Sequence, residues 1–261
     1  MFFIAREMTA RFRRLFPHGK FRWVLIAVSL IGAAISVSEL LVMKLFTTLV
    51  LHEGEFERSV LVWAVVGFFL FFIVTRVGQF LQRNYRVKVL ARAFRMVGKE
   101  RTSKEETREW AMAFELTNFV SQGTQLIAIL AFFLLLNPYI AIINVVILIV
   151  ILQVLSSIFR KQLEVHAQLN TPEPGKRVKP WQRHGARIRA AETGGLASGA
   201  GMLILMAALL YLSINGDITH SNTLVIFLGA RLQNSVINNA SQSLMRYARF
   251  NSETVTNNDE T

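Results

Sequence analysis

The chain of 261 residues is 52% hydrophobic and only 18% charged, and it carries a net charge of +12. A water-soluble domain of this length has more charge and fewer long apolar runs, so the composition excludes an ordinary soluble globular protein. The lack of cysteine excludes disulfides, thiolate metal sites and cysteine nucleophiles.

The first element, residues 1–20, is predicted to be an amphipathic helix lying at the membrane interface. Ile4, Met8 and Phe12 recur at helical spacing, while Arg6 lies off that face. The start shows no apolar core followed by a small-residue cleavage site, so we expect no cleavable signal peptide.

Six apolar runs follow, at residues 23–50, 60–81, 111–136, 140–159, 194–214 and 224–245. Each has about the 20 residues that an α-helix needs to cross a hydrocarbon core of about 30 Å. We therefore predict an all-α polytopic membrane protein, with a domain of six transmembrane helices at residues 21–250. The tail at 251–261 is expected to be disordered.

The basic residues are distributed unevenly between the connections. Six lie in 6–22, nine in 83–108 and eight in 160–189, whereas the opposite connections LHEGEFER, NPYI and NGDITHSN contain only Arg58. This asymmetry predicts that both termini and the two basic loops are cytoplasmic. We expect an integral protein of a bacterial cytoplasmic (inner) membrane. The basic residues are expected to meet the lipid bilayer and not nucleic acid, with docking to an acidic partner as the alternative.

No motif for catalysis or phosphate binding is present in the sequence. There is no GxxxxGK[ST] phosphate loop and no G-x-S-x-G nucleophile elbow. The five histidines are scattered without metal-ligand spacing. We therefore expect no enzyme activity, no cofactor and no metal site.

Charged residues interrupt the apolar runs, and helical rise gives four of them a depth. Glu39 lies about 24 Å from the inner end of its run, a level similar to Arg231, about 10 Å from the outer end of its own. Arg76 and Glu115 both lie near the inner side. Unpaired ions at such depths cost from about 3 to more than about 10 kcal/mol. Two ion pairs are predicted, Glu39 with Arg231 and Arg76 with Glu115.

Two runs also carry polar stripes. Steps of three or four residues place on one helical face Glu115, Asn118, Gln122 and Gln125 of the third run, and Arg231, Asn234, Asn238 and Ser241 or Gln242 of the sixth. Such stripes serve either hydrogen bonds between helices or the lining of a water-filled cavity, and the sequence leaves both open. Gly195 and Gly199 have the spacing of close helix packing.

These features together resemble the transmembrane domain of type I ABC exporters. SVSELL in the first run is similar to the family's acidic position there, and SSIFRKQLEVHAQ to its basic exit segment after the fourth span. The last two runs, LYLSINGDITHSNTLVIFLGARLQNSVINNASQSLMRYARF, are similar to its hairpin of spans 5 and 6. The chain departs from the family in ending soon after Phe250 without an ATPase domain, in its shorter inner loops, and in lacking the prolines typical of spans 1 and 6.

The resemblance implies one of two functions. The first is a transport subunit, a homodimer or hetero-oligomer with a polar path for an unknown polar or amphipathic substrate. Such a subunit would work with an ATPase on a separate chain or be driven by ions, with Glu39 as the first proton-site candidate. The second is a non-transporting scaffold subunit that organises a larger membrane protein complex.

Overall fold

The computed structural model describes residues 19–51, 57–96, 103–170 and 180–258. The predicted interfacial helix therefore lies outside the described residues, apart from its last two positions. Six long α-helices make up the described chain: α2 Gly19–Val50, α3 Arg58–Met96, α4 Ser103–Leu136, α5 Pro138–Asn170, α6 Pro180–Ile214 and α7 His220–Asn258. Each predicted apolar run lies within one of them, so the all-α prediction is confirmed. Four of the helices continue well beyond their apolar runs at the basic end, and α7 remains helical past residue 250 to Asn258.

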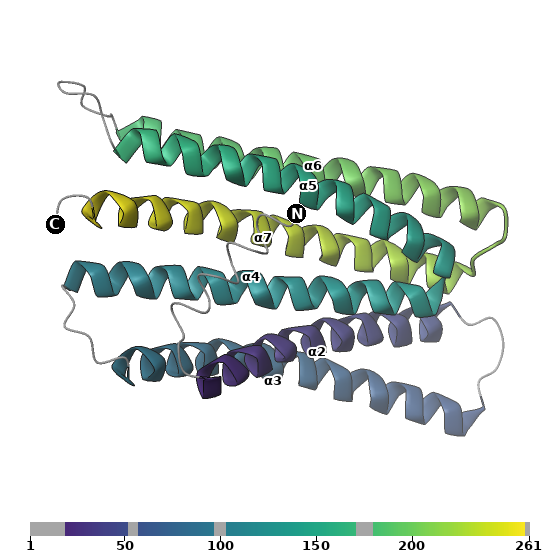
Figure 1. Ribbon diagram of the computed structural model, residues 1–261. Coiled ribbons are helices and arrows are strands. Elements are labelled where there is room, and N and C mark those ends of the chain that lie inside the picture. Colours follow the sequence, from purple (N-terminus) through teal and green to yellow (C-terminus); the bar gives the residue numbers. More distant parts are fainter. Residues whose placement is uncertain (1–18, 52–56, 97–102, 171–179, 259–261) are drawn as a thin grey trace.

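The helices lie side by side along one axis (Figure 1). At one end of the bundle the last residues of α2, α4 and α6 lie near the first residues of α3, α5 and α7; at the other end lie the last residues of α3 and α5 and the first residues of α4 and α6. The described residues of the basic segments 83–108 and 160–189 belong to the helix ends at this second end of the bundle. The fold therefore separates a basic end from an end almost free of basic residues, as the sequence predicts.

Two tight turns at the less basic end have clear sequence causes. Asn137 accepts a hydrogen bond from the Ile140 backbone N–H at 3.0 Å, and Pro138 follows as the first residue of α5. This is N-capping by an amide side chain, with proline at the position where its missing N–H costs nothing. Gly216 ends α6 with a φ of +79°, while the Asp217 N–H bonds the Leu212 carbonyl at 3.0 Å. Glycine adopts this left-handed geometry without strain.

The helix α7 lies at the centre of the packing. It contacts α4, α5, α6 and α2, whereas α3 packs mainly on α2 and touches α4 only weakly. The main apolar core lies between α4, α5, α6 and α7, and includes the fully buried Ile129, Phe133 and Ile226. A smaller core, with Leu116, Phe159, Leu244 and other residues, holds the same helices together nearer the basic end.

Glycines fix the close helix contacts. On α6, an added Cβ at Gly201 would lie 2.7 Å from Ile151 of α5, and one at Gly194 would lie 2.8 Å from Leu155. At Gly195 the nearest atom would be 3.4 Å away, and at Gly199 none lies within 4 Å. The prediction of close packing is therefore wrong for Gly199, while Gly195 lies in contact with Asn238 of α7. The packing face of α6 is turned by one residue, onto Gly194 and Gly201.

Five helices are long and apolar enough to cross a membrane: α2, α3, α4, α5 and α6. The protein is therefore an integral membrane protein. The helix α7 is 39 residues long, the same length as α3, but does not meet this apolar criterion over its described residues. The structure thus supports five of the six predicted spans by composition, and α7 owes its place in the bundle to its four neighbours.

Candidate functional site

The polar residues of α7 divide between two sides of the helix. Those that are exposed recur at steps of three or four residues: Arg231, Ser235, Asn239, Gln242 and Arg246. Such steps keep residues on one helical face, and we call this set the α7 stripe. The α7 stripe runs along the most centrally packed helix of the bundle and is left open by the other helices. No acidic residue occurs between His220 and Phe250 of α7, so the stripe presents cations, amides and a hydroxyl.

The buried side of α7 uses its polar groups for bonds between helices. Asn144 of α5 and Gln233 exchange two hydrogen bonds, at 2.7 and 2.8 Å, and both residues are buried. Asn234 accepts a hydrogen bond from Ser198 of α6. A reciprocal amide pair satisfies a donor and an acceptor on each partner, which removes the cost of burying them.

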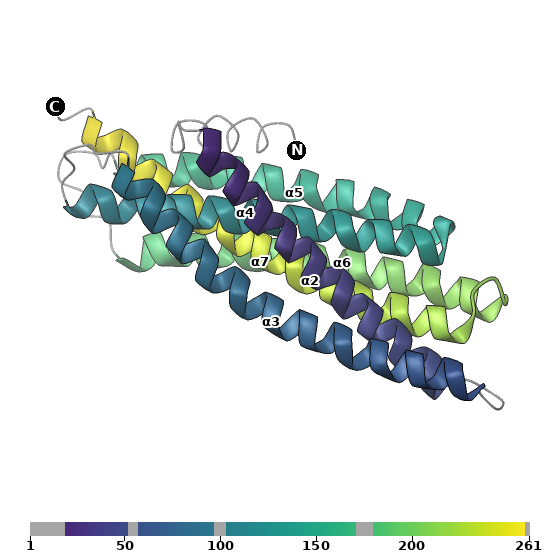
Figure 2. The same cartoon turned by 90° about the horizontal axis from the view of Figure 1, so that it is seen from below.

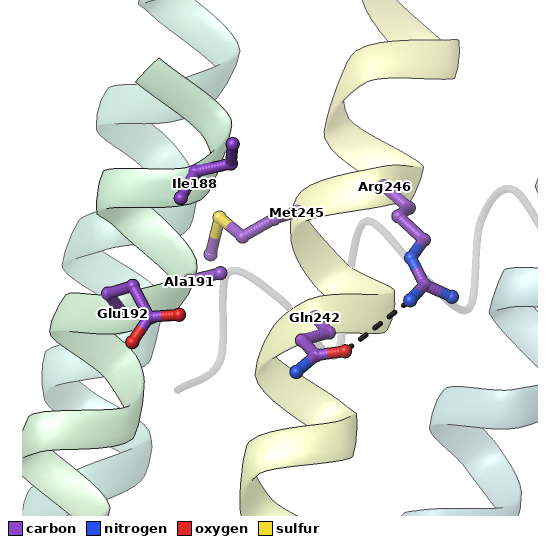
Figure 3. A pocket seen from close by; sticks show the side chains of 6 residues that line it. All are labelled: Ile188, Ala191, Glu192, Gln242, Met245 and Arg246. Atoms are coloured by element: carbon purple, nitrogen blue, oxygen red, sulfur yellow. Dashed lines mark hydrogen bonds between the residues drawn. The ribbon is translucent and has the colours of Figure 1, made fainter. Parts of the chain in front are cut away.

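At the basic end the α7 stripe meets α4 and α6. Arg246 donates to the carboxylate of Glu115 at 3.3 Å and to Gln242 at 3.4 Å. The Glu115 side chain is 8% exposed and that of Arg246 is 48% exposed, so the pair joins the interior to the surface. A cavity of about 160 Å³ beside it is lined by Gln242 and Arg246 and, from α6, by Glu192 (Figure 3).

A second polar seam joins α4 to the α2–α3 hairpin. Asn118, one turn after Glu115, accepts a hydrogen bond from Arg86 of α3. Gln82 and Ser121 share a hydrogen bond of 3.0 Å, and Thr124 donates to the backbone carbonyl of Ser29 at 2.9 Å. The helix α4 therefore carries one acceptor for an arginine of α3 and another for an arginine of α7.

The less basic end is held by a third polar contact. Lys44 of α2 donates to Asn222 at 2.5 Å and to Ser221 at 3.4 Å, and Thr47 lies 3.3 Å from Ser221. These bonds tie α2 to the start of α7, in the same region where α2 crosses obliquely over the bundle (Figure 2). The α7 stripe begins beyond this contact.

Neither predicted ion pair forms. Glu39 and Arg76 line one cavity between α2 and α3, while Glu115 pairs with Arg246. Arg231 is exposed and makes no ion pair with a described residue. The depth estimate failed because it ended the second span at residue 81, whereas α3 continues to Met96. The antiparallel register of the hairpin therefore places Arg76 near the middle of the bundle, beside Glu39, and not at the inner side.

The predicted stripes are partly separated by the structure. On α4, Glu115 faces α7, Asn118 faces α3, and Gln122 is half-buried with its Oε1 atom unpaired among the described residues. On α7, Asn234 turns to α6 and Asn238 is half-buried near Gly195. Residues that the sequence reasoning missed include Arg86, Gln82, Asn144, Gln233 and Arg246 in the hydrogen-bond networks, and Ser235 and Asn239 in the α7 stripe. Asn144 is the only polar residue between Tyr139 and Gln153, and that isolation was the available signal for a buried partner.

The fold and this site define a polytopic α-helical membrane protein with a polar central helix. Among the described residues, no group of three or more histidine, aspartate or glutamate side chains is placed to hold a metal ion. No protein-family model matches the chain, and no curated protein sequence matches it significantly. Its function has to be inferred from the chemistry of α7 and of the helices around it.

Proposed function

We propose that the protein is a membrane-embedded subunit of an exporter-like transport system, in which the α7 stripe lines a water-filled path for a polar or amphipathic substrate. The observation that carries the proposal is the exposure of five polar residues in register along the central helix. From Arg231 to Arg246 the stripe extends about 22 Å, most of a hydrocarbon core of about 30 Å.

The free-energy cost of placing arginine in lipid favours an α7 stripe that contacts water or polar protein groups over one that faces lipid. An arginine at the centre of a bilayer costs at least about 2.5–3.5 kcal/mol, and the stripe has two. Arg246 is compensated by Glu115, but Arg231 has no ion pair among the described residues. Water or polar protein must therefore meet the stripe. A second copy or another subunit, facing the stripe, would close the path.

The proposal includes an orientation and a class of partner. The basic end of the bundle faces the cytoplasm of a bacterial inner membrane, because positive residues are retained on that side. An ATPase on a separate chain would then meet the connections of that end. Its binding would bias the packing of α4 against α7, where Glu115 and Arg246 pair.

Cysteine accessibility tests this proposal, and the chain has no native cysteine to remove. Cysteine at 231, 235, 239 or 242 is expected to react with a membrane-impermeant thiol reagent in membranes. Leu203→Cys, at a residue of α6 that is 72% exposed, is the lipid-facing control and is expected to stay unreactive. Gln233→Cys reports on the buried side of α7. Stripe cysteines that react no faster than Leu203→Cys would contradict a water-filled path.

A scaffold role is the second candidate, favoured by the short connections at the basic end. Only residues 97–102 and 171–179 separate α3 from α4 and α5 from α6. Besides the helix ends of α3–α6 that extend beyond the apolar runs, little chain is available there for binding an ATPase. In this role the α7 stripe would bind the polar side of a partner helix. Purification of the native complex in mild detergent decides between the two, because an associated ATPase supports transport and a large assembly without one supports the scaffold.

A further inference from the structure

The hairpin of α2 and α3 has a charged cavity that the α7 stripe does not include. Its volume is about 170 Å³, and it is lined by Glu39 of α2 and Arg76 of α3 together with uncharged side chains. Glu39 is half-buried and Arg76 is exposed, and within the described ranges they form no ion pair with each other. The Arg76 guanidinium instead lies over the Phe72 ring, 5.2 Å from its centroid. Two opposite charges therefore share one level of the bundle without neutralising each other.

The level of these charges is the interior of the membrane. Glu39 lies inside the candidate span Trp23–Val50, and Arg76 lies midway along the candidate span Arg58–Arg92. A bilayer has acyl chains at this depth, and a charge that faces them is strongly destabilised. Such a residue pairs with an opposite charge of a protein or contacts water held by protein. The open side of the hairpin is therefore expected to meet another protein surface.

That open side lies at the edge of the bundle. The helix α3 packs on α2 and touches α4 only weakly, and the hairpin lies on the opposite side of the bundle from α5 and α6 (Figure 1). On α3, Phe69, Phe72 and Phe80 are exposed to 57%, 43% and 66%. With Arg76 they recur at steps of three or four residues and therefore share one helical face. This face presents one cation among apolar rings, next to the carboxylate of Glu39.

A second copy of the chain brings the required charges to this level. Copies inserted in the same orientation are related by a two-fold axis along the membrane normal, and rotation about this axis leaves every residue at its own depth. Because Glu39 and Arg76 share one level, the axis can bring Glu39 of one copy to Arg76 of the other. The reverse contact then follows from the symmetry. An unrelated partner would need an acid and a base with this same spacing at this same depth.

We propose that the protein forms a two-fold dimer through the α2–α3 hairpin, in which Glu39 of each copy pairs with the partner's Arg76. The guanidinium donates hydrogen bonds to the carboxylate, and the low dielectric constant of the membrane interior strengthens their attraction. The exposed phenylalanines of α3 pack on the second copy around the two ion pairs. This interface is separate from the α7 stripe, so it holds whether or not that stripe lines a path.

Charge reversal in the full chain tests the dimer. Two differently tagged copies are co-expressed, and the fraction of one that copurifies with the other in mild detergent is measured. Wild-type copies are expected to copurify. Glu39→Arg or Arg76→Glu, each introduced in both copies, places like charges at both contacts and should lower copurification at least roughly tenfold. Glu39→Arg in one copy and Arg76→Glu in the other give opposite charges at both contacts and should restore it.

The double variant Glu39→Arg/Arg76→Glu distinguishes a contact between copies from one within a chain. It should pair with itself and exclude wild type, because each mixed contact joins like charges. An ion pair within one chain predicts the opposite result, a double variant that mixes freely with wild type. Matched controls are Lys161→Glu and Glu164→Arg, both exposed on α5, which among the described residues contacts neither α2 nor α3. Both controls should copurify as wild type does.

Three results would overturn the proposal. Wild-type copies that do not copurify would remove the dimer. Copurification that survives both single reversals would place the contact elsewhere, for example at the α7 stripe. Free mixing of the double variant with wild type would assign the pair to a single chain. If a single variant fails to fold, the double variant, which keeps the net charge of wild type, supplies the answer.

Discussion

The helices α3 and α7 have the same length of 39 residues and opposite surroundings. Between Ser59 and Thr75 the helix α3 is apolar on all sides, and only 6% of its most apolar stretch is buried. The polar helix α7 contacts four neighbours and has a row of fully buried residues, Leu244 and Tyr247 among them. In a soluble protein the apolar helix would occupy the core. Here the apolar helix is at the edge, because lipid is as good a solvent for it as protein.

This comparison shows what decides whether a helix lies at the centre or at the edge of the bundle. A polar helix has to be surrounded by groups that satisfy it, and α7 finds them in Asn144, Ser198 and Glu115. An apolar helix is stable in the bilayer if it is long enough to cross it and if its backbone hydrogen bonds are unbroken. Close packing, and not apolarity, is therefore expected to determine how sensitive each helix is to substitution.

The largest expected effect comes from matched truncations on the two helices. Leu244→Ala removes a fully buried side chain of α7 and should lower the free energy of unfolding by about 2–5 kcal/mol, because a cavity is left behind. Leu70→Ala on α3, where leucine is 55% exposed, should change it by less than about 0.5 kcal/mol. Thermal unfolding in one detergent measures both. Equal losses would contradict the peripheral placement of α3.

The elements themselves could be predicted from the sequence, because apolar runs of about 20 residues and charge asymmetry are strong local signals. The ends of the helices could not. The helix α3 continues after its apolar run to Met96, so Arg76 lies near the middle of the helix, and the packing of α2 on α3 brings Arg76 and Glu39 to one cavity. The position of a residue along its own helix does not tell which residues of a neighbouring helix lie beside it. Which side of α7 is covered also depends on its neighbours. For this reason the sequence placed Asn234 in one stripe with Arg231, although Asn234 faces α6 and Arg231 is exposed.

A smaller effect is expected from the amide pair that joins α5 to α7. Asn144→Leu or Gln233→Leu alone leaves one buried amide unsatisfied, which should cost about 1–2 kcal/mol. The double variant removes both amides and should recover part of that loss. Thermal unfolding of the four proteins gives the coupling directly. A double variant whose loss equals the sum of the single losses would show that the polarity of α7 is not satisfied by α5.

The smallest expected effect compares two possible partners of Glu115, namely Arg246 of α7 and Arg76 of α3. Glu115→Gln and Arg246→Gln should be coupled by about 0.5–1 kcal/mol, a modest value because Arg246 is half exposed and solvent screens the pair. Glu115→Gln and Arg76→Gln should combine additively, within about 0.5 kcal/mol, because Arg76 faces the cavity with Glu39. Unfolding in detergent at low and high salt measures both cycles, and added salt should weaken only the first coupling. Coupling of Glu115 to Arg76 and not to Arg246 would restore the pairing expected from depth alone. It would also require α3 to pack closely on α4 over most of its length, and the difference between a covered α7 and a peripheral α3 would then disappear.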